Sequence, residues 1–534
     1  MKKHFLYLIL IGLLLLSFTQ CAKRGRPTGG KRDTIPPKVV KSTPENFTTQ
    51  FKKNEIRIYF NEYIKLKNIN KELIVSPPLT YAPIIYPLST AKYIKIKILD
   101  TLKENTTYSF NFGKSIVDNN EENEYPYFKY IFSTGSYIDS LTLSGKVKDA
   151  LLPNPEKNVV VMLYEKNQTY NDSLVFSKKP TYITVANDST GSFTFENLKE
   201  GNYKLVALKE KTNDYIFQPK TDKIGFVATT ITVPSDSSYT LTLFKETPDF
   251  KFTTPKHNTK NHILFGYEGI PQDLNLSLLS KVADTFSSKQ YYDFKKDTLH
   301  YWFKPSVAVD TLVFLGKSKN NIDTLFVRIK DLYKDSLQVK TINTGTQKFN
   351  DSLHLQLNTP IETITNQKIV VTDKDTLSVP FSVSVTSRYN IAHLFFPKTE
   401  NQKYKITLLP GAVTDFYGNT NDTLTYRINT KSESDYGSIA LTLKNASVFP
   451  LLVELVNTKF KVVDKIVLED NKPVLFSLIT PGNYYVRIVF DTNKNGKWDT
   501  GNFLKNQQPE RILYYPSQLE VRPNWSLQET FILE

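Results

Sequence analysis

The residues best suited to chemistry lie near the C-terminal end, in residues 491–502, which read DTNKNGKWDTGN. Oxygen-bearing side chains occupy the first, third, fifth and ninth positions, and the seventh offers its backbone carbonyl. Calcium takes roughly six to eight hard oxygen ligands, and a glycine such as Gly496 permits the sharp wrap around the ion. The predicted calcium ligands are Asp491, Asn493, Asn495, Lys497 (through its backbone) and Asp499.

This spacing is similar to that of an EF-hand-like calcium loop, whose twelfth position is a bidentate Glu. Here the twelfth residue is Asn502, and the low negative charge of the segment predicts feeble affinity. The alternative is an Asx-Gly loop that closes on its own side-chain-to-backbone hydrogen bonds without an ion. Both interpretations stay open at this stage, and calcium is the one cofactor that the sequence suggests.

The second reactive group is Cys21, the sole cysteine of the 534 residues, so no intramolecular disulfide can form. A short basic start precedes an almost purely apolar run from Phe5 to Phe18. As a helix this run would span about 21 Å, short of a hydrocarbon core of about 30 Å. Residues 1–20 are therefore predicted to be a cleavable signal peptide.

Residues 17–21, SFTQC, resemble the lipobox of Bacteroidota-type lipoproteins. The resemblance implies that Cys21 becomes the first residue, diacylated on sulfur and usually acylated on its amine. Phe18 and Gln20 depart from the more widespread pattern, which has Leu three positions before the cysteine and a small residue directly before it. The alternative is a chance cysteine behind an ordinary signal peptide.

A flexible tether is predicted at residues 21–34. Between Ala22 and Arg32 it carries five basic residues, three glycines and no acid, so it cannot form a packed core. Surface-export signals in the lipoprotein class that it resembles are typically acidic just after the cysteine. The basic tether therefore favours the periplasmic face of the outer membrane over the cell surface.

The remaining composition favours strands. Hydrophobic residues make up 40% and aromatic residues 13%, with many Tyr, Phe, Val, Ile and Thr. The net charge of +15 comes from lysines scattered through alternating segments such as Tyr93–Ile98, where alternation places them on the solvated face. This distribution argues against nucleic-acid binding and leaves attraction to anionic envelope polymers or lipid headgroups as the minor alternative.

One triplet, Asp followed by Ser or Thr and then Leu, recurs and is interpreted as a device that starts strands. It begins at Asp100, Asp139, Asp172, Asp297, Asp310, Asp323, Asp335, Asp351, Asp375 and Asp422.

The chain also repeats itself. Glu104–Tyr108 matches Glu400–Tyr404 at an offset of 296 residues, and Gly201–Tyr203 matches Gly482–Tyr484 at an offset of 281. Nearly constant offsets predict a two-module unit that occurs twice. Gly201 is expected to supply a turn conformation that other residues resist.

The first module of each unit resembles the bacterial, S-layer-type Ig-like domain, on a Pro-rich start (residues 35–44), a strand ending in Phe60-Asn-Glu62 and a closing strand ending in Phe132-Ser-Thr134. The second resembles prealbumin-like or carboxypeptidase-regulatory-like sandwiches, on residues 188–207 and 480–489. The predicted fold is all-β: tandem Ig-like and prealbumin-like β-sandwiches with an internal duplication. The predicted modules are module 1 (35–136, Ig-like), module 2 (140–246, prealbumin-like), module 3 (247–334, a middle sandwich), module 4 (335–432, Ig-like) and module 5 (435–534, prealbumin-like).

No catalytic pattern stands out. Ser89-Thr-Ala-Lys92 matches the Ser-x-x-Lys of penicillin-recognising enzymes but precedes a predicted strand and lacks the companion motifs. His257 and His262 are five apart and do not converge on a metal. Trp302, Trp498 and Trp525 could stack on sugars or pack internally.

The sequence thus predicts a non-enzymatic, lipid-anchored envelope scaffold whose partner is an envelope protein or a glycan. The alternatives are a glycan-binding accessory of a polysaccharide-uptake system, which requires exposed coplanar aromatics on one module, and a hydrolase, which requires a cleft that gathers carboxylates.

Overall fold

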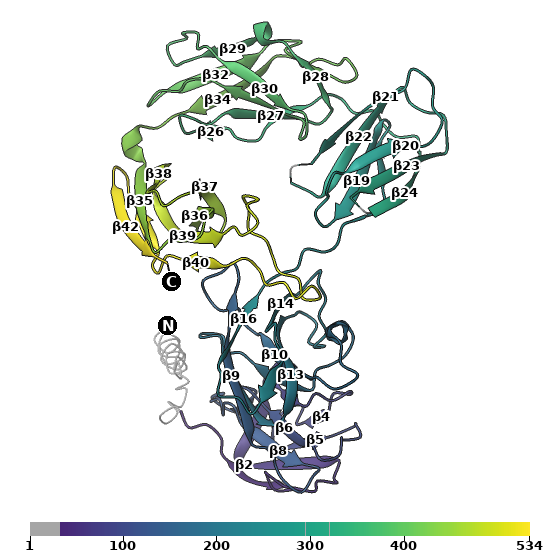
Figure 1. Ribbon diagram of the computed structural model, residues 1–534, viewed down its shortest axis with the longest axis vertical. Coiled ribbons are helices and arrows are strands. Elements are labelled where there is room, and N and C mark those ends of the chain that lie inside the picture. Colours follow the sequence, from purple (N-terminus) through teal and green to yellow (C-terminus); the bar gives the residue numbers. More distant parts are fainter. Residues whose placement is uncertain (1–32, 294, 320, 534) are drawn as a thin grey trace, which may run out of the picture. The chain divides into compact units, whose positions relative to one another are not determined.

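The computed structural model describes residues 33–293, 295–319 and 321–533 (Figure 1). Over these residues the chain is all-β and forms tandem β-sandwiches, and the only helical elements there are one short α-helix and three 3-10 helices. The chain divides into two compact units. The first extends to Thr142 and includes residues 181–183 and 196–199, and the second holds the remainder to the C-terminal end.

Module 1 lies in the first unit. Its long strand β2 alternates buried apolar residues, Ile56, Ile58 and Phe60, with outward polar ones, which is the pattern of a half-buried strand. One sheet has the order β1-β2-β5-β4, with β7 also paired to β2, and the other has the order β3-β6-β8. The elements are β1 (Val39–Thr43), β2 (Glu55–Leu66), α2 (Ile69–Glu72), β3 (Ile74–Ser76), β4 (Ile84–Tyr86), β5 (Ala91–Lys97), β6 (Thr107–Asn111), β7 (Ile116–Asp118) and β8 (Lys129–Ser133).

Module 4 has two four-stranded sheets, β25-β27-β31-β30 and β26-β34-β32-β29, and the short pair β28-β33. Its core includes Leu353, Leu355 and Leu357, at alternate positions of β27. The elements are β25 (Val339–Thr341), β26 (Gly345–Thr346), β27 (Leu353–Leu357), β28 (Ile361–Ile364), η2 (Asn366–Lys368), β29 (Ile369–Thr372), β30 (Ser382–Thr386), β31 (Ile391–Phe395), β32 (Lys403–Leu408), β33 (Val413–Asp415) and β34 (Leu424–Asn429).

Modules 1 and 4 share a tyrosine-centred turn. The buried Tyr108 hydroxyl accepts the backbone N–H of Lys103 at 2.9 Å, and 296 residues later the Tyr404 hydroxyl accepts the N–H of Thr399 at 2.8 Å. The hydrogen bond fixes the loop that leads into β6 in one module and β32 in the other. The two modules thus carry the same hydrogen bond at the offset of 296 residues on which the predicted duplication rests.

Two further pairs of matching residues in modules 1 and 4 also accept backbone hydrogen bonds in the same way as each other. The hydroxyl oxygens of Thr134 and Thr430, also 296 apart, each accept a backbone N–H at 3.0 Å. The side-chain oxygens of Asn61 and Asn358 each accept, at 2.7 Å, the backbone N–H of the residue just before a neighbouring strand, Lys38 before β1 and Gln338 before β25. The repeated residues are therefore retained where they satisfy backbone donors that would otherwise be unpaired.

Modules 2 and 5 share one topology. The three-stranded sheets β12-β9-β16 and β38-β35-β42 each contain a parallel pair, β9 with β16 and β35 with β42. The second sheets, β11-β10-β13-β14 and β37-β36-β39-β40, each carry one extra strand, β15 or β41, on the third strand. The elements are β9 (Leu141–Asp149), β10 (Val160–Glu165), η1 (Asp172–Phe176), β11 (Tyr182–Val185), β12 (Ser192–Leu198), β13 (Gly201–Lys209), β14 (Lys223–Phe226), β15 (Ile231–Val233), β16 (Tyr239–Leu243), η3 (Glu433–Asp435), β35 (Gly437–Lys444), β36 (Leu451–Asn457), β37 (Val462–Leu468), β38 (Val474–Ile479), β39 (Gly482–Phe490), β40 (Ile512–Tyr514), β41 (Leu519–Val521) and β42 (Ser526–Ile532).

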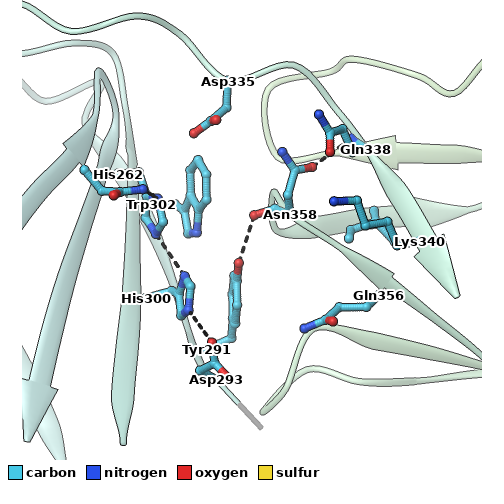
Figure 2. A pocket seen from close by; sticks show the side chains of 12 residues that line it. His262, Tyr291, Asp293, His300, Trp302, Asp335, Gln338, Lys340, Gln356 and Asn358 are labelled. Carbon is cyan, nitrogen blue, oxygen red and sulfur yellow. Dashed lines mark hydrogen bonds and ion pairs between the residues drawn. The ribbon is translucent and has the colours of Figure 1, made fainter. Parts of the chain in front are cut away.

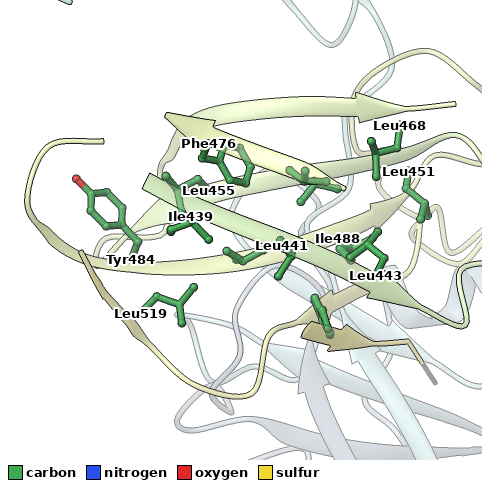
Figure 3. Packing of buried hydrophobic residues seen from close by; sticks show 14 of the residues in the cluster. Ile439, Leu441, Leu443, Leu451, Leu455, Leu468, Phe476, Tyr484, Ile488 and Leu519 are labelled. Atoms are coloured by element: carbon green, nitrogen blue, oxygen red, sulfur yellow. The ribbon is translucent and has the colours of Figure 1, made fainter. Parts of the chain in front are cut away.

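The core of module 5 shows how such a sandwich is held together. Ile439, Leu441 and Leu443 project from one face of β35 and meet Leu451, Leu455 and Ile488 of the facing sheet (Figure 3). Each of these six side chains is at most 3% exposed. Full burial of one such side chain stabilises the fold by about 1.5–3 kcal/mol.

Module 3, predicted from strand pattern alone, is also a two-sheet sandwich. Its sheets are β17-β19-β22-β21, with β18 on β19, and β20-β23-β24. The elements are β17 (Lys251–Phe252), β18 (Lys256–Thr259), β19 (His262–Glu268), β20 (Asn275–Leu278), β21 (Ser287–Tyr292), β22 (Thr298–Lys304), β23 (Thr311–Ser318) and β24 (Asn321–Arg328).

The Asp-Ser/Thr-Leu triplet starts strands in only part of its occurrences. It directly precedes or opens a strand at Asp139, Asp297, Asp310, Asp351 and Asp422. At Asp172 the prediction is wrong, because the triplet forms the 3-10 helix η1, whose first turn is capped by the Asn171 side chain. A side-chain cap thus outweighs the tendency of the triplet to start a strand.

The expectation for Gly201 is also wrong. It opens β13 without a left-handed backbone, and a Cβ added there would lie 3.3–3.5 Å from the Tyr203 ring. Gly201 therefore does not supply a left-handed turn.

Candidate functional site

The predicted lipidation site, Cys21, lies outside the described residues, as do the predicted signal peptide and most of the tether. Between residues 33 and 533, no helix is long and apolar enough to cross a membrane. Acylation of Cys21 therefore stays a prediction.

The predicted calcium segment forms the start of the long loop between β39 and β40. Asp491 follows β39 directly and is buried, at 3% exposure. Its Oδ1 accepts the N–H of Asn495 at 3.1 Å and its Oδ2 accepts the N–H of Gly496 at 2.7 Å. Gly496 has φ +75°, a conformation that side-chain-bearing residues rarely adopt. The loop therefore wraps around the Asp491 carboxylate.

The other predicted ligands gather at the same place. The Oδ2 of Asp499 accepts the amide groups of Asn493, at 2.6 Å, and of Asn495. The backbone N–H of Lys497 donates to the Asn495 Oδ1 at 3.0 Å. In this arrangement the loop closes on its own hydrogen bonds. Calcium would require both Asn amides to rotate and turn their oxygens inward, as the ion accepts only oxygen ligands here.

Two residues that the sequence did not single out complete the loop. Glu510 accepts the N–H groups of Thr492, at 2.7 Å, and Asp499, at 3.0 Å. Lys465 of β37 donates its ammonium to the Gly496 carbonyl at 2.7 Å. Asn502, the twelfth residue of the motif, instead pairs with Gln507 in the next turn. Among the described residues no group of three or more His, Cys, Asp or Glu could hold a metal ion, and calcium stays a prediction.

Beyond the turn, this loop reaches module 2. Phe503 is fully buried, and its ring lies 5.2 Å from that of Phe226 and 6.2 Å from that of Phe176. Its backbone N–H donates to Oε1 of Glu246 at 2.5 Å, and burial raises the pKa of that carboxyl. We name this contact, formed by Phe176, Phe226, Glu246 and Phe503, the 2–5 seam.

A buried ion pair lies beside the 2–5 seam. Glu454 and Arg487 stand opposite each other on β36 and β39, 2.7 Å apart, with each side chain 8% exposed. Arg487 also donates to the carbonyl of Leu151, in module 2, at 3.3 Å, and the Tyr514 hydroxyl donates to the same carbonyl at 2.5 Å. The charged pair therefore serves the junction as well as the core of module 5.

Modules 3 and 4 also meet through aromatic and polar side chains. Strand register places His262 opposite Trp302, and Tyr291 opposite His300. The four rings form one continuous stack, Tyr291–His300–His262–Trp302, with centroid distances of 4.6, 5.0 and 3.8 Å (Figure 2). We call this stack, together with the residues of module 4 that it contacts, the 3–4 seam.

The histidines of the 3–4 seam are poor acids and bases. Burial lowers the pKa of His262 to about 2 and also lowers that of His300. His262 Nε2 and His300 Nδ1 lie 2.9 Å apart, and His300 Nε2 lies 3.5 Å from the Asp293 carboxylate. The neutral rings therefore pack and hydrogen-bond within the junction.

A cavity of about 280 Å³ lies between the ring stack and module 4 (Figure 2). On the side of module 4, the cavity is lined by Gln338, Lys340, Gln356 and Asn358. The Tyr291 hydroxyl crosses to the Asn358 carbonyl at 2.9 Å. Trp302 is only 2% exposed and Tyr291 only 5%. The ring faces are thus covered and offer little area on which a sugar could stack.

Module 4 contributes a second set of contacts to the 3–4 seam. The Tyr417 hydroxyl donates to the carbonyl of Asn261 at 3.2 Å, and the Lys304 ammonium lies 4.2 Å from the centre of the Phe416 ring. Lys289 pairs with Glu362 at 2.8 Å.

The remaining residues considered in the sequence do not converge. Trp498 donates its indole N–H to the Glu510 carbonyl, and Trp525 is 57% exposed beneath Arg522. Lys92 lies in β5, as the strand prediction required. His257 accepts the Lys330 N–H at 3.1 Å. The three tryptophans therefore form no common surface.

Two histidine pairs could not be foreseen from the sequence. His262 and His300 lie on the neighbouring strands β19 and β22, and His354 and His393 stand opposite each other on β27 and β31 with their Nδ1 atoms 2.8 Å apart. Both pairs depend on how two strands are aligned with each other. The spacing of residues along a single strand does not reveal that alignment.

The fold and these sites define a class: a tandem β-sandwich protein with Ig-like modules. Residues 33–134 match the bacterial Ig-like domain family, and the match covers module 1 alone. No curated protein is similar enough in sequence to match this chain.

Three solved structures are similar over much of the chain. The Bacillus anthracis TIE protein is 10% identical over 95% of this chain and 76% of its own, with a TM-score of 0.14. BcpA, the major pilin subunit of Bacillus cereus, is 11% identical over 74% and 99%, with a TM-score of 0.14. The S-layer protein rSbsC(31-844) is 12% identical over 91% and 67%, with a TM-score of 0.16. At such scores the whole chains do not superpose.

Proposed function

We propose that this chain is a non-enzymatic, lipid-anchored scaffold of the cell envelope. Acylated Cys21 holds it to a membrane, the basic tether spans the headgroup region, and the sandwiches present surfaces to an envelope protein or glycan. Each acyl methylene buried in lipid contributes about 0.8 kcal/mol, so two or three chains give a stable anchor.

The observation that carries this proposal is that prominent polar and aromatic side chains of the second unit lie at contacts between modules. The buried ion pair Glu454–Arg487, the inserted Phe503 and the ring stack around Trp302 all lie where one module contacts another. Groups of these types could form an active site in another setting. Here they are occupied in joining sandwiches, which supports a load-bearing or spacing role.

The basic tether supports a position on the periplasmic face of the outer membrane. Five cations between residues 22 and 32 would each gain about 1 kcal/mol near an anionic leaflet. Protease added to intact cells is expected to spare the protein and to degrade it after the outer membrane is permeabilised. Degradation on intact cells would place it on the surface.

The anchor is tested by Cys21→Ala in the full chain, with Thr28→Ala in the predicted tether as a matched control outside the lipobox-like segment. The unaltered chain and the control are expected in the detergent phase of a Triton X-114 partition, and Cys21→Ala in the aqueous phase. A Cys21→Ala chain that stays fully membrane-bound would refute lipid anchoring.

A further inference from the structure

Module 1 carries a sheet face on which outward tyrosines and cations occupy neighbouring positions. It is the outward face of the sheet β1-β2-β5-β4, opposite the buried Ile56, Ile58, Ile94 and Ile96. We call it the tyrosine–lysine face, and its members are Lys41, Arg57, Tyr59, Tyr86, Tyr93, Lys95 and Lys97.

Strand register arranges these residues as a grid. One row crosses three strands as Lys41, Tyr59 and Tyr93, since Lys41 pairs with Tyr59 and Tyr59 with Tyr93. The next row runs Arg57, Lys95 and Tyr86 by the same pairing rule. Neighbouring strands lie about 4.8 Å apart and like-facing residues of one strand about 7 Å apart, so the grid presents its groups at closely spaced, regular intervals.

The tyrosine rings hold the lysine ammonium groups in place. The Nζ of Lys41 lies 5.2 Å from the centre of the Tyr59 ring, and the Nζ of Lys95 lies 5.1 Å from that of Tyr86. The Tyr59 and Tyr93 rings are neighbours at 5.8 Å. Cation–π contacts at exposed sites favour such arrangements, so the cations are positioned before any ligand arrives.

The surface remains open and strongly basic. Tyr86 is 39% exposed and Tyr93 is 40% exposed. The one carboxylate among the grid's strand partners is Glu55, which pairs with Arg57 at 2.8 Å. Lys41, Lys95 and Lys97 have no ion-pair partner among the salt bridges of the described residues.

We propose that the tyrosine–lysine face binds an acidic polysaccharide, a glycan chain that bears carboxylate or phosphate groups. Lysine and arginine meet the anions, and the half-exposed tyrosines offer sugar rings both an apolar face and a hydroxyl. A regular grid of such groups suits an extended polymer. A lipid bilayer fits less well, because membrane-surface elements insert Trp, Phe or Leu, and the seven members of the tyrosine–lysine face include none of these.

The test measures binding of the purified full chain, as its Cys21→Ala form, to polygalacturonate and to neutral dextran. Using this form removes the anchor, so the result does not depend on whether Cys21 is acylated. Polygalacturonate is expected to bind, increasingly tightly as salt falls, and dextran is expected not to bind. Lys95→Glu/Lys97→Glu should weaken polygalacturonate binding at least about tenfold.

A matched control separates this face from net charge. Lys146→Glu/Lys148→Glu makes the same charge change on two exposed lysines of β9, in module 2, and should leave affinity within about twofold. Tyr86→Ala/Tyr93→Ala, which leaves the charge intact, should also weaken binding. Circular dichroism melts of each variant establish that module 1 is folded.

Three results would overturn the proposal: absence of polygalacturonate binding, equal loss in both lysine pairs, or no loss in the tyrosine pair. Vesicles containing phosphatidylglycerol form a further arm. If the substitutions in the tyrosine–lysine face weakened vesicle binding and left polygalacturonate binding unchanged, the partner would be a membrane.

Discussion

At the scale of single residues, the hydroxyls of Tyr108 and Tyr404 show why particular side chains recur in both Ig-like modules. Each accepts one backbone N–H at a turn. Tyr108→Phe removes the acceptor and should cost module 1 about 1 kcal/mol, measured as faster hydrogen exchange in β6 at a given urea concentration. Tyr137→Phe, at a side chain 61% exposed, should change exchange little. Equal behaviour of the two variants would refute this role.

The pair Glu454–Arg487 should behave as a coupled unit. Removing one partner leaves a charge that is buried to 8% exposure, so Glu454→Leu or Arg487→Met alone should destabilise module 5 by about 3–5 kcal/mol. The double variant replaces both charges by apolar groups and should cost much less than the sum of the two. Additive losses, measured by urea denaturation of the full chain, would contradict a coupled pair.

Glu210 in module 2 predicts a pH dependence. Burial raises the pKa of its carboxyl to about 7, against about 4.3 in an unfolded chain. The folded state therefore binds the proton more tightly than the unfolded chain does. The contribution of this group to the free energy of unfolding is fully present below about pH 4.3 and is lost as the pH rises through 7. Glu210→Gln should flatten the decline in melting temperature of module 2 between pH 5 and pH 8. An unchanged decline would show that Glu210 does not cause it.

At the scale of elements, the loop between β39 and β40 combines the predicted ion site with the contact at Phe503. If calcium binds, about 1 mM should raise the melting temperature of module 5 by about 2–4 °C, and magnesium should not. Asp499→Asn should abolish the shift because it removes a ligand charge. If calcium raised the melting temperature of the variant and of the unaltered chain equally, or did not raise that of the unaltered chain, the loop closed by its own hydrogen bonds would be the correct interpretation.

The elements also show how far sequence reasoning extends. Strands β2 and β27 could be predicted because the alternation of apolar and polar residues is a local signal. The duplication could be predicted because a constant offset between matching residues is a periodic signal. The gathering of Asp491 and Asp499 could be predicted because one short segment contains both.

The parts that could not be predicted depend on distant segments. Glu510 joins the loop only after the chain returns to it, and the His262–His300 pair depends on the register of two strands. At Asp172 a local cap decided the outcome against the pattern. These features need three-dimensional pairing, which one sequence does not specify.

At the scale of the molecule, the 2–5 seam couples modules that are distant in sequence. Phe503→Ala should cost about 3–5 kcal/mol, because it empties a site packed against Phe226. Hydrogen exchange should increase in β14 and β16 of module 2 as well as in the loop itself. Leu504→Ala, next to it and 57% exposed, is the control. A loss confined to module 5 would mean that the seam does not couple the two modules.

The scaffold proposal treats the whole chain as sandwiches carried by one acylated residue, and the mature amino terminus tests it most directly. Mass spectrometry of the amino-terminal peptide, from protein extracted from its native envelope, should find a chain that begins at Cys21 and carries two or three fatty acyl groups. A peptide that begins elsewhere, or that holds Cys21 as a free thiol, would contradict the anchor on which the proposed function depends.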